Sequence, residues 1–311
     1  MGTLRIMFTS DTIKAEFVML DDRFAGCDGD FVLKRHFADA RKTEGPAYFA
    51  GGRYLVFSDI PNDRLLRYDE TTGAVGVLRH GSGYANGNTV DRQGRLVTCE
   101  QGNRRVTRTE HDGSVTVLAD SYRGKRLNSP NDVVVRADGS VWFTDPSYGI
   151  TGDYEGNKGD SDFGGACYVF RVDPVDGEVT VVADDFVRPN GLAFSPDEQR
   201  LFVVDTRQDP SHIRVFDVAD DGRLTGGAIH ATCDVGRFDG MRLDAAGRIW
   251  AAAWDGVHCF APDGDLIGKL LLPESVANLT FGGLKRNHLY ITAGTSLYSL
   301  RVTVNGAEYP R

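Results

Sequence analysis

Short apolar runs separated by glycine-containing turns recur along the whole chain, and none follows the 3.6-residue period of a helix. The clearest runs, such as 54–59 and 141–145, have five or six residues and are rich in aromatic and β-branched side chains. Runs of this kind are typical of strands buried on both faces. Asp-Gly pairs such as Asp112-Gly113 supply the positive φ that a tight hairpin needs. The pattern therefore predicts antiparallel β-structure.

The apolar runs belong to a repeat. Six stretches begin with a polar residue and reach the end of a strongly apolar strand about 15 residues later. The six starts are Glu44, Asn86, Asn131, Asn190, Asp239 and Asn278. A period of about 40–60 residues with four strands in each unit is the mark of a propeller blade. We therefore predict an all-β fold, a six-bladed β-propeller with four antiparallel strands per blade, in which the six starts converge near one axis.

The two ends of the chain complete this picture. The sixth repeat stops soon after residues 296–300, which leaves too little chain for its outer strand. The run 31–37 precedes the first repeat and belongs to no other blade, so we predict that it completes the last blade and closes the ring. We expect residues 1–311 to form a single domain, with 1–30 as a peripheral extension outside the ring.

Composition restricts the classes of partner. The formal net charge of −9 disfavours nucleic acid or an anionic membrane as partner. Five scattered cysteines without a Cys-x-x-Cys pair indicate free thiols in a reducing compartment. We find no signal peptide at the start and no apolar run of about 18 residues, so we expect a cytoplasmic monomer or homodimer without a membrane span.

The six starts carry two acids and four amides. Carboxylate and carbonyl oxygens without cysteine or histidine suit Ca²⁺ or Mg²⁺, and also Mn²⁺ or Fe²⁺. Two carboxylates would neutralise one divalent cation, and amides would fill its shell without excess charge. The alternative is that these polar side chains only line a water-filled channel.

Several motifs together resemble the senescence-marker-protein/gluconolactonase/luciferin-regenerating-enzyme-like family of six-bladed propellers, and the bacterial sugar-lactonase branch in particular. The matching segments are Glu44-Gly-Pro46, Tyr84-Ala-Asn-Gly87, Leu127-Asn-Ser-Pro-Asn-Asp132, Val141-Trp-Phe-Thr-Asp-Pro-Ser-Tyr-Gly149, Arg188-Pro-Asn-Gly-Leu-Ala-Phe194, Phe238-Asp-Gly-Met241 and Ala277-Asn-Leu-Thr-Phe-Gly-Gly283. They span about residues 40–300, so the resemblance covers nearly the whole chain.

The resemblance implies one catalytic divalent metal at the mouth of the channel. Carried over by motif, Glu44, Asn190 and Asp239 are its ligands, and Asn131 is a fourth ligand or a neighbour that binds substrate. Ca²⁺ is the expected metal, with Mg²⁺, Mn²⁺, Zn²⁺ or Fe²⁺ as alternatives. Animal members have an arginine where this chain has Ser129, so substrate contacts there differ.

The expected reaction is hydrolysis of a sugar lactone, such as gluconolactone, to the aldonic acid. A metal would polarise the lactone carbonyl. Asp239 is the candidate base that accepts a proton from water. Two alternatives are that Asp239 is only a ligand to a metal that activates hydroxide, or that a carboxylate attacks covalently. Substrate contacts are expected from Asn131, Asn86, Asp145 and Tyr148, because a polyol needs many directed hydrogen bonds.

Other readings stay open at the level of sequence. The Gly- and Asp-rich insertion 147–165 is either a lid or a surface loop. The acids that end the second strands, among them Asp145, either contact substrate or bond backbone N–H groups of turns. Two other functions fit the same oxygen donors, a metal-dependent phosphotriesterase and a non-catalytic calcium-binding propeller.

Overall fold

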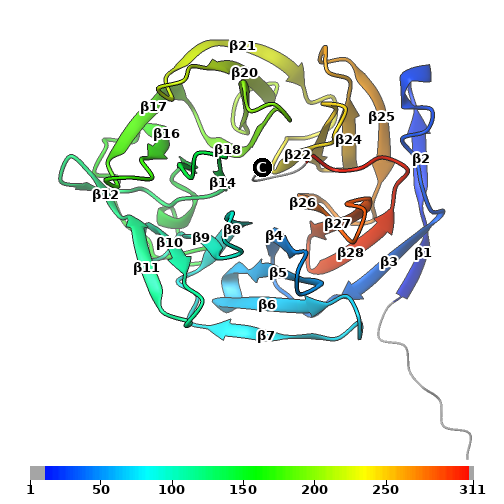
Figure 1. The fold of residues 1–311 in the computed structure, drawn as a ribbon, viewed down its shortest axis with the longest axis horizontal. Coiled ribbons are helices and arrows are strands. Elements are labelled where there is room, and N and C mark those ends of the chain that lie inside the picture. The colour runs from blue at the N-terminus through cyan, green and yellow to red at the C-terminus, as the bar shows by residue number, and fades with distance from the viewer. Residues whose placement is uncertain (1–10, 308–311) are drawn as a thin grey trace, which may run out of the picture.

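The computed structural model describes residues 11–307, and within them the long strands form six sheets arranged around a central axis (Figure 1). Each sheet runs outward from an inner strand beside the axis, and neighbouring strands are antiparallel. This confirms the predicted six-bladed β-propeller with four antiparallel strands as the unit of each blade.

Four blades are built from consecutive strands. The first has β4 (Thr43–Phe49), β5 (Tyr54–Asp59), β6 (Arg64–Asp69) and β7 (Val75–His80). The second has β8 (Ala85–Val90), β9 (Leu96–Glu100), β10 (Arg105–Thr109) and β11 (Val115–Ala119). The third has β14 (Val133–Val135), β15 (Val141–Asp145), β16 (Cys167–Val172) and β17 (Val179–Phe186). The fourth has β18 (Pro189–Phe194), β19 (Arg200–Asp205), β20 (His212–Val218) and β21 (Leu224–Thr232).

The last two blades each take up a strand from the N-terminal part of the chain. The fifth has β22 (Met241–Leu243), β23 (Ile249–Ala253), β24 (Gly256–Phe260) and β25 (Leu266–Leu271), with β2 (Glu16–Met19) on its outer edge. The sixth has β26 (Val276–Gly282), β27 (His288–Ala293), β28 (Ser296–Arg301) and β3 (Val32–Phe37), with β1 (Asp11–Lys14) beyond.

The pairing of β3 with β28 closes the ring. Phe37 lies opposite Leu297 and Arg35 lies opposite Tyr298, so the run predicted from residues 31–37 is the fourth strand of the last blade. Because β2 adds to the neighbouring blade, the N-terminal segment bridges blades five and six from outside (Figure 1). The expectations about the first ten residues lie outside the described residues.

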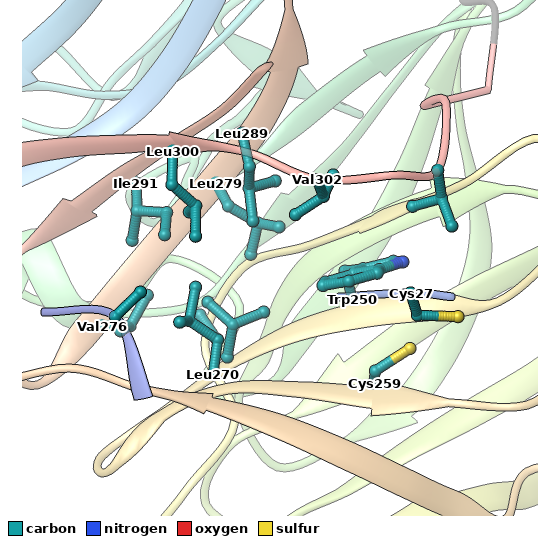
Figure 2. Close-up of a cluster of buried hydrophobic side chains, with 14 of the residues drawn as sticks. Cys27, Trp250, Cys259, Leu270, Val276, Leu279, Leu289, Ile291, Leu300 and Val302 are labelled. Atoms are coloured by element: carbon teal, nitrogen blue, oxygen red, sulfur yellow. The ribbon is translucent and has the colours of Figure 1, made fainter. Parts of the chain in front are cut away.

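The core lies between adjacent blades, where the faces of the sheets pack on one another. Figure 2 shows one such cluster, in which Trp250, Leu270 and Ile291 come from blades five and six and Cys27 comes from the N-terminal segment. These four side chains are at most 2% exposed. Complete burial of an apolar side chain contributes about 1.5–3 kcal/mol, so each interface between blades fixes its neighbours firmly. The inner strands are thereby held as a rigid platform.

Short elements complete the fold. They are the hairpin β12 (Ser121–Tyr122) and β13 (Lys125–Arg126), and the 3-10 helices η1 (Asp22–Phe24), η2 (Ile60–Asn62) and η3 (Tyr148–Ile150). In the part of the chain that the structure describes, no helix is long and apolar enough to cross a membrane.

Candidate active site

The beginnings of the inner strands meet at one mouth of the propeller and line a pocket of about 450 Å³. Six of the seven predicted site residues line it: Glu44, Asn86, Asn131, Tyr148, Asn190 and Asp239. The seventh, Asp145, does not. A smaller cavity of about 200 Å³, around Pro46, Arg242 and Phe281, holds none of the predicted residues.

Glycines next to the polar starts allow neighbouring blades to come this close. The Gly87 N–H donates to the carbonyl oxygen of Asn131 at 2.7 Å, and the Gly191 N–H donates to that of Asp239 at 3.1 Å. A Cβ on Gly87 would lie 2.4 Å from the first oxygen, and one on Gly191 would lie 2.5 Å from the second. Such distances exclude any side chain, so the Asn-Gly pairs are needed for the backbones to converge.

Asp132 fills the position that glycine occupies after Asn86 and Asn190. Its side chain is 1% exposed, and it does not line the pocket. The Asn278 amide donates to Asp132 Oδ2 at 3.3 Å and to Glu44 Oε2 at 3.2 Å, which links the two carboxylates. The Arg242 guanidinium lies 3.8 Å from Asp132 and partly balances its charge. Sequence reasoning missed this residue, although the break in the Asn-Gly pattern was a visible signal.

The acids that end the second strands hold the segments leading into the pocket. Asp145 Oδ2 accepts from the Asn128 N–H at 2.7 Å, and Asp205 Oδ2 accepts from the Val187 N–H at 2.8 Å. Asp59 bonds the turn before the first inner strand in the same way, through a backbone N–H at 2.9 Å. Each bonded N–H lies three residues before a polar start. This geometry favours a positioning role for Asp145 over contact with substrate.

The electrostatics of the pocket disfavour two ionised carboxylates. Burial, followed by the charges of Asp239 and Asp132, holds the pKa of Glu44 well above its ordinary value. Burial also raises the pKa of Asp239 to about 7, although the nearby Lys42 ammonium acts in the opposite direction. The Asn190 amide bonds the Asp239 carboxylate, which favours its ionised form. The protein therefore holds the carboxyl groups of Glu44 and Asp239 so that their ionised forms repel each other. A bound cation would relieve this repulsion.

The donor set fits a hard divalent cation. Within residues 11–307, no lysine, arginine or histidine nitrogen comes within 4.0 Å of the Glu44 or Asp239 carboxylate. The same residues contain no group of three His, Cys, Asp or Glu side chains suited to a metal. The site would thus depend on two carboxylates together with the amide oxygens of Asn131 and Asn190, which suit Ca²⁺ or Mg²⁺.

The insertion 147–165 contributes to the pocket and is tied to neighbouring blades. It supplies Tyr148 and Glu155 to the lining, and Glu155 Oε1 accepts from Lys42 Nζ at 2.6 Å. Further along, Asn157 Nδ2 donates to the carbonyl oxygen of Gly102 at 3.1 Å. The segment therefore forms part of the pocket lining and is fixed to the first two blades.

Sequence reasoning also missed several other residues that line the pocket. They are Lys42, Thr206, Arg207, Arg237 and Trp254. For two of them a signal existed, because Lys42 and Arg237 stand two residues before Glu44 and Asp239. Residues two apart on extended chain point to the same side.

Known proteins are similar to this chain over most of its length. The chain is 30% identical over 293 residues to a gluconolactonase of Zymomonas mobilis, a match that covers 86% of this chain and 81% of the other. It is 30% identical over 260 residues to the pentonolactonase XacC of Haloferax volcanii, which covers 81% of each. The solved structure of a gluconolactonase of Xanthomonas campestris superposes with a TM-score of 0.88 at 36% identity, covering 96% of this chain and 99% of that one.

The match to the family covers most of the chain. Residues 42–295, which begin at Lys42 before the first inner strand and end within the sixth blade, match the family described as SMP-30/Gluconolactonase/LRE-like region. The chain therefore belongs to the SMP-30/gluconolactonase/LRE-like family.

Proposed function

We propose that the protein is a divalent-metal-dependent lactonase that opens a sugar lactone to the aldonic acid. Glu44, Asn190 and Asp239 would hold the metal, with Asn131 as fourth ligand. The observation that carries the proposal is the convergence of two carboxylates and two amides, without a basic partner at 4.0 Å among the described residues, in the pocket of a family member. Relatives named gluconolactonase and pentonolactonase support the substrate class.

The reaction requires water to add to the carbonyl carbon and the bond from that carbon to the ring oxygen to break. A divalent cation bound at the site would supply Lewis-acid stabilisation of the negative charge that develops on the carbonyl oxygen. A carboxylate oxygen of Asp239 would accept the proton of the attacking water, and a pKa near 7 suits a base that works at neutral pH. The ring oxygen takes up a proton as it leaves, so lactone and water give one hydroxy acid.

Binding of a polyol would fall to the amides and the aromatic ring of the lining. Asn86 and Asn131 offer both donors and acceptors, and Tyr148 can stack on a sugar ring. A buried polar group left without a partner costs about 1–3 kcal/mol, so such a lining disfavours an alkyl chain. We therefore propose an aldonolactone of five or six ring atoms, such as a glucono-, xylono- or arabinonolactone.

The test is a pH-indicator assay of acid release over a panel of substrates. The panel contains sugar lactones, an acyl-homoserine lactone and a phosphotriester, each with and without chelator. We expect turnover of sugar lactones that chelator abolishes. Turnover of the acyl lactone alone, or of the phosphotriester alone, would overturn the proposed substrate, and a metal site that binds its cation without any turnover would favour a calcium-binding role.

A further inference from the structure

The pocket lining includes a second group of side chains with chemistry of its own. Besides the oxygen donors proposed for the metal, the lining contains Thr206 and Arg207, which follow β19, together with Arg237 and Trp254. Trp254 is 59% exposed, so this group offers a large aromatic surface as well as two guanidinium groups. Neither arginine is needed to explain hydrolysis of a neutral lactone.

Arg237 is held in a fixed orientation by the backbone. Its Nη1 donates to the carbonyl oxygens of Thr206 and Gln208, both at 2.9 Å. These two bonds use both hydrogens of Nη1, whereas Nε and Nη2 carry three further N–H donors. A role limited to stapling the segment 206–208 would account for Nη1 but not for the donors that remain.

Arg207 stands beside it at the rim. Its side chain is exposed, and its guanidinium carbon lies 6.0 Å from the centroid of the Tyr148 ring. Within the described part of the chain, no carboxylate lies within 4.0 Å of either Arg207 or Arg237. Both therefore face the pocket as full positive charges.

The charges of the lining show what is left uncompensated. Lys42 and Glu155 form an ion pair at 2.6 Å and cancel each other. Glu44 and Asp239 match the two positive charges of a divalent cation. Arg207 and Arg237 remain, and their forked donors suit the oxygens of a phosphate, sulfonate or carboxylate.

We infer that the substrate is a sugar lactone that carries an anionic substituent away from its carbonyl, which Arg207 and Arg237 bind. This rests on the proposed function, because it assigns the orientation of the lactone in the same pocket. The carbonyl lies at the oxygen donors and the anionic end lies at the arginines. Turnover of the anionic lactone would then exceed that of its neutral analogue.

The experiment compares three lactones with the metal-loaded protein: gluconolactone, its 6-phosphate, and the lactone of glucaric acid. We expect kcat/KM for at least one anionic lactone to exceed that for gluconolactone by 10-fold or more, and the better of the two identifies the substituent. Arg207→Gln should reduce this ratio by at least 10-fold, and Arg237→Gln should reduce it further. Arg123→Gln, which removes an exposed arginine outside the pocket, is the matched control and should leave both rates unchanged.

A ratio near one, or a ratio that Arg207→Gln does not change, would overturn the inference while leaving the lactonase proposal intact. Failure of all three lactones would instead contradict the proposed function. Calorimetry then tests the arginine pair without turnover, since 6-phosphogluconate should bind wild type at least 10-fold more tightly than gluconate does. Equal binding of the two acids would also overturn the inference.

Discussion

Replacement of Asp239 by asparagine should have opposite effects on stability with and without metal. The side chain keeps its shape and can still bond the Asn190 amide, but it no longer carries a charge beside Glu44. In chelator above neutral pH, we expect Asp239→Asn to be more stable than wild type. With Ca²⁺ added, we expect wild type to gain stability and the variant to gain little, because the variant has lost a proposed ligand.

The magnitude follows from the raised pKa. The folded protein holds the pKa of Asp239 at about 7, against an ordinary value of 3.8. At about 1.4 kcal/mol for each pH unit between these values, the ionised carboxylate costs up to about 4 kcal/mol. The Asp239 side chain is partly exposed to the pocket, so we expect about half of this, or about 2 kcal/mol. For 311 residues that corresponds to about 3 °C in Tm.

The sign depends on pH. The pKa of Asp239 is higher in the folded protein than in the unfolded chain, so wild type loses stability as pH rises from about 4 to about 7. The stability advantage of the variant should therefore be complete at pH 8 and smaller at pH 5. Thermal unfolding at both pH values, in chelator and in Ca²⁺, measures all four conditions. The exposed Asp160→Asn is the matched control and should show neither effect. A variant less stable than wild type in chelator at pH 8, or an equal gain from Ca²⁺ in both proteins, would refute the reasoning.

Three further predictions concern other parts of the molecule. Gly191→Ala should lower Tm by several degrees and weaken Ca²⁺ binding, since its Cβ would lie 2.5 Å from a backbone oxygen of the next repeat; unchanged calorimetric titration would contradict this. Glu155→Gln leaves the Lys42 ammonium unpaired beside the site, so we expect Ca²⁺ affinity to fall by about 3- to 10-fold, and the same titration would reject the idea if affinity rose. Burial lowers the pKa of His36 and of His288 to about 4, so stability should fall as pH drops from about 6.5 towards 4, by about 2 kcal/mol per histidine at pH 5. Urea unfolding of wild type and His36→Gln checks this, and equal losses in both would contradict it.

Much of the fold could be predicted because the same pattern of strands recurs six times along the chain. Each inner start is followed by an apolar strand, and the missing outer strand of blade six matched the unassigned run before blade one. The fifth strands β1 and β2 were not predicted, because residues 11–19 have weak patterning and find their partners only once blades five and six present an outer edge. Pairing of that kind depends on tertiary contacts and not on local sequence preference.

The residues of the candidate site could likewise be predicted only in part. Residues at equivalent places in the repeat, such as Glu44 and Asp239, could be brought together from sequence, because symmetry places them around one axis. Arg207 and Glu155 could not, since one lies in a loop and the other in an insertion that no other blade shares. Their places depend on contacts such as the Lys42–Glu155 pair, which join segments far apart in the chain.

The most direct test of the metal-dependent lactonase is the initial rate of acid release from a sugar lactone before and after one equivalent of Ca²⁺ is returned to chelator-treated protein. The proposed site predicts no activity above background in the stripped protein, full recovery in wild type, and no recovery in Glu44→Gln that remains folded by circular dichroism. Full activity in the stripped protein, or equal recovery in Glu44→Gln, would contradict it.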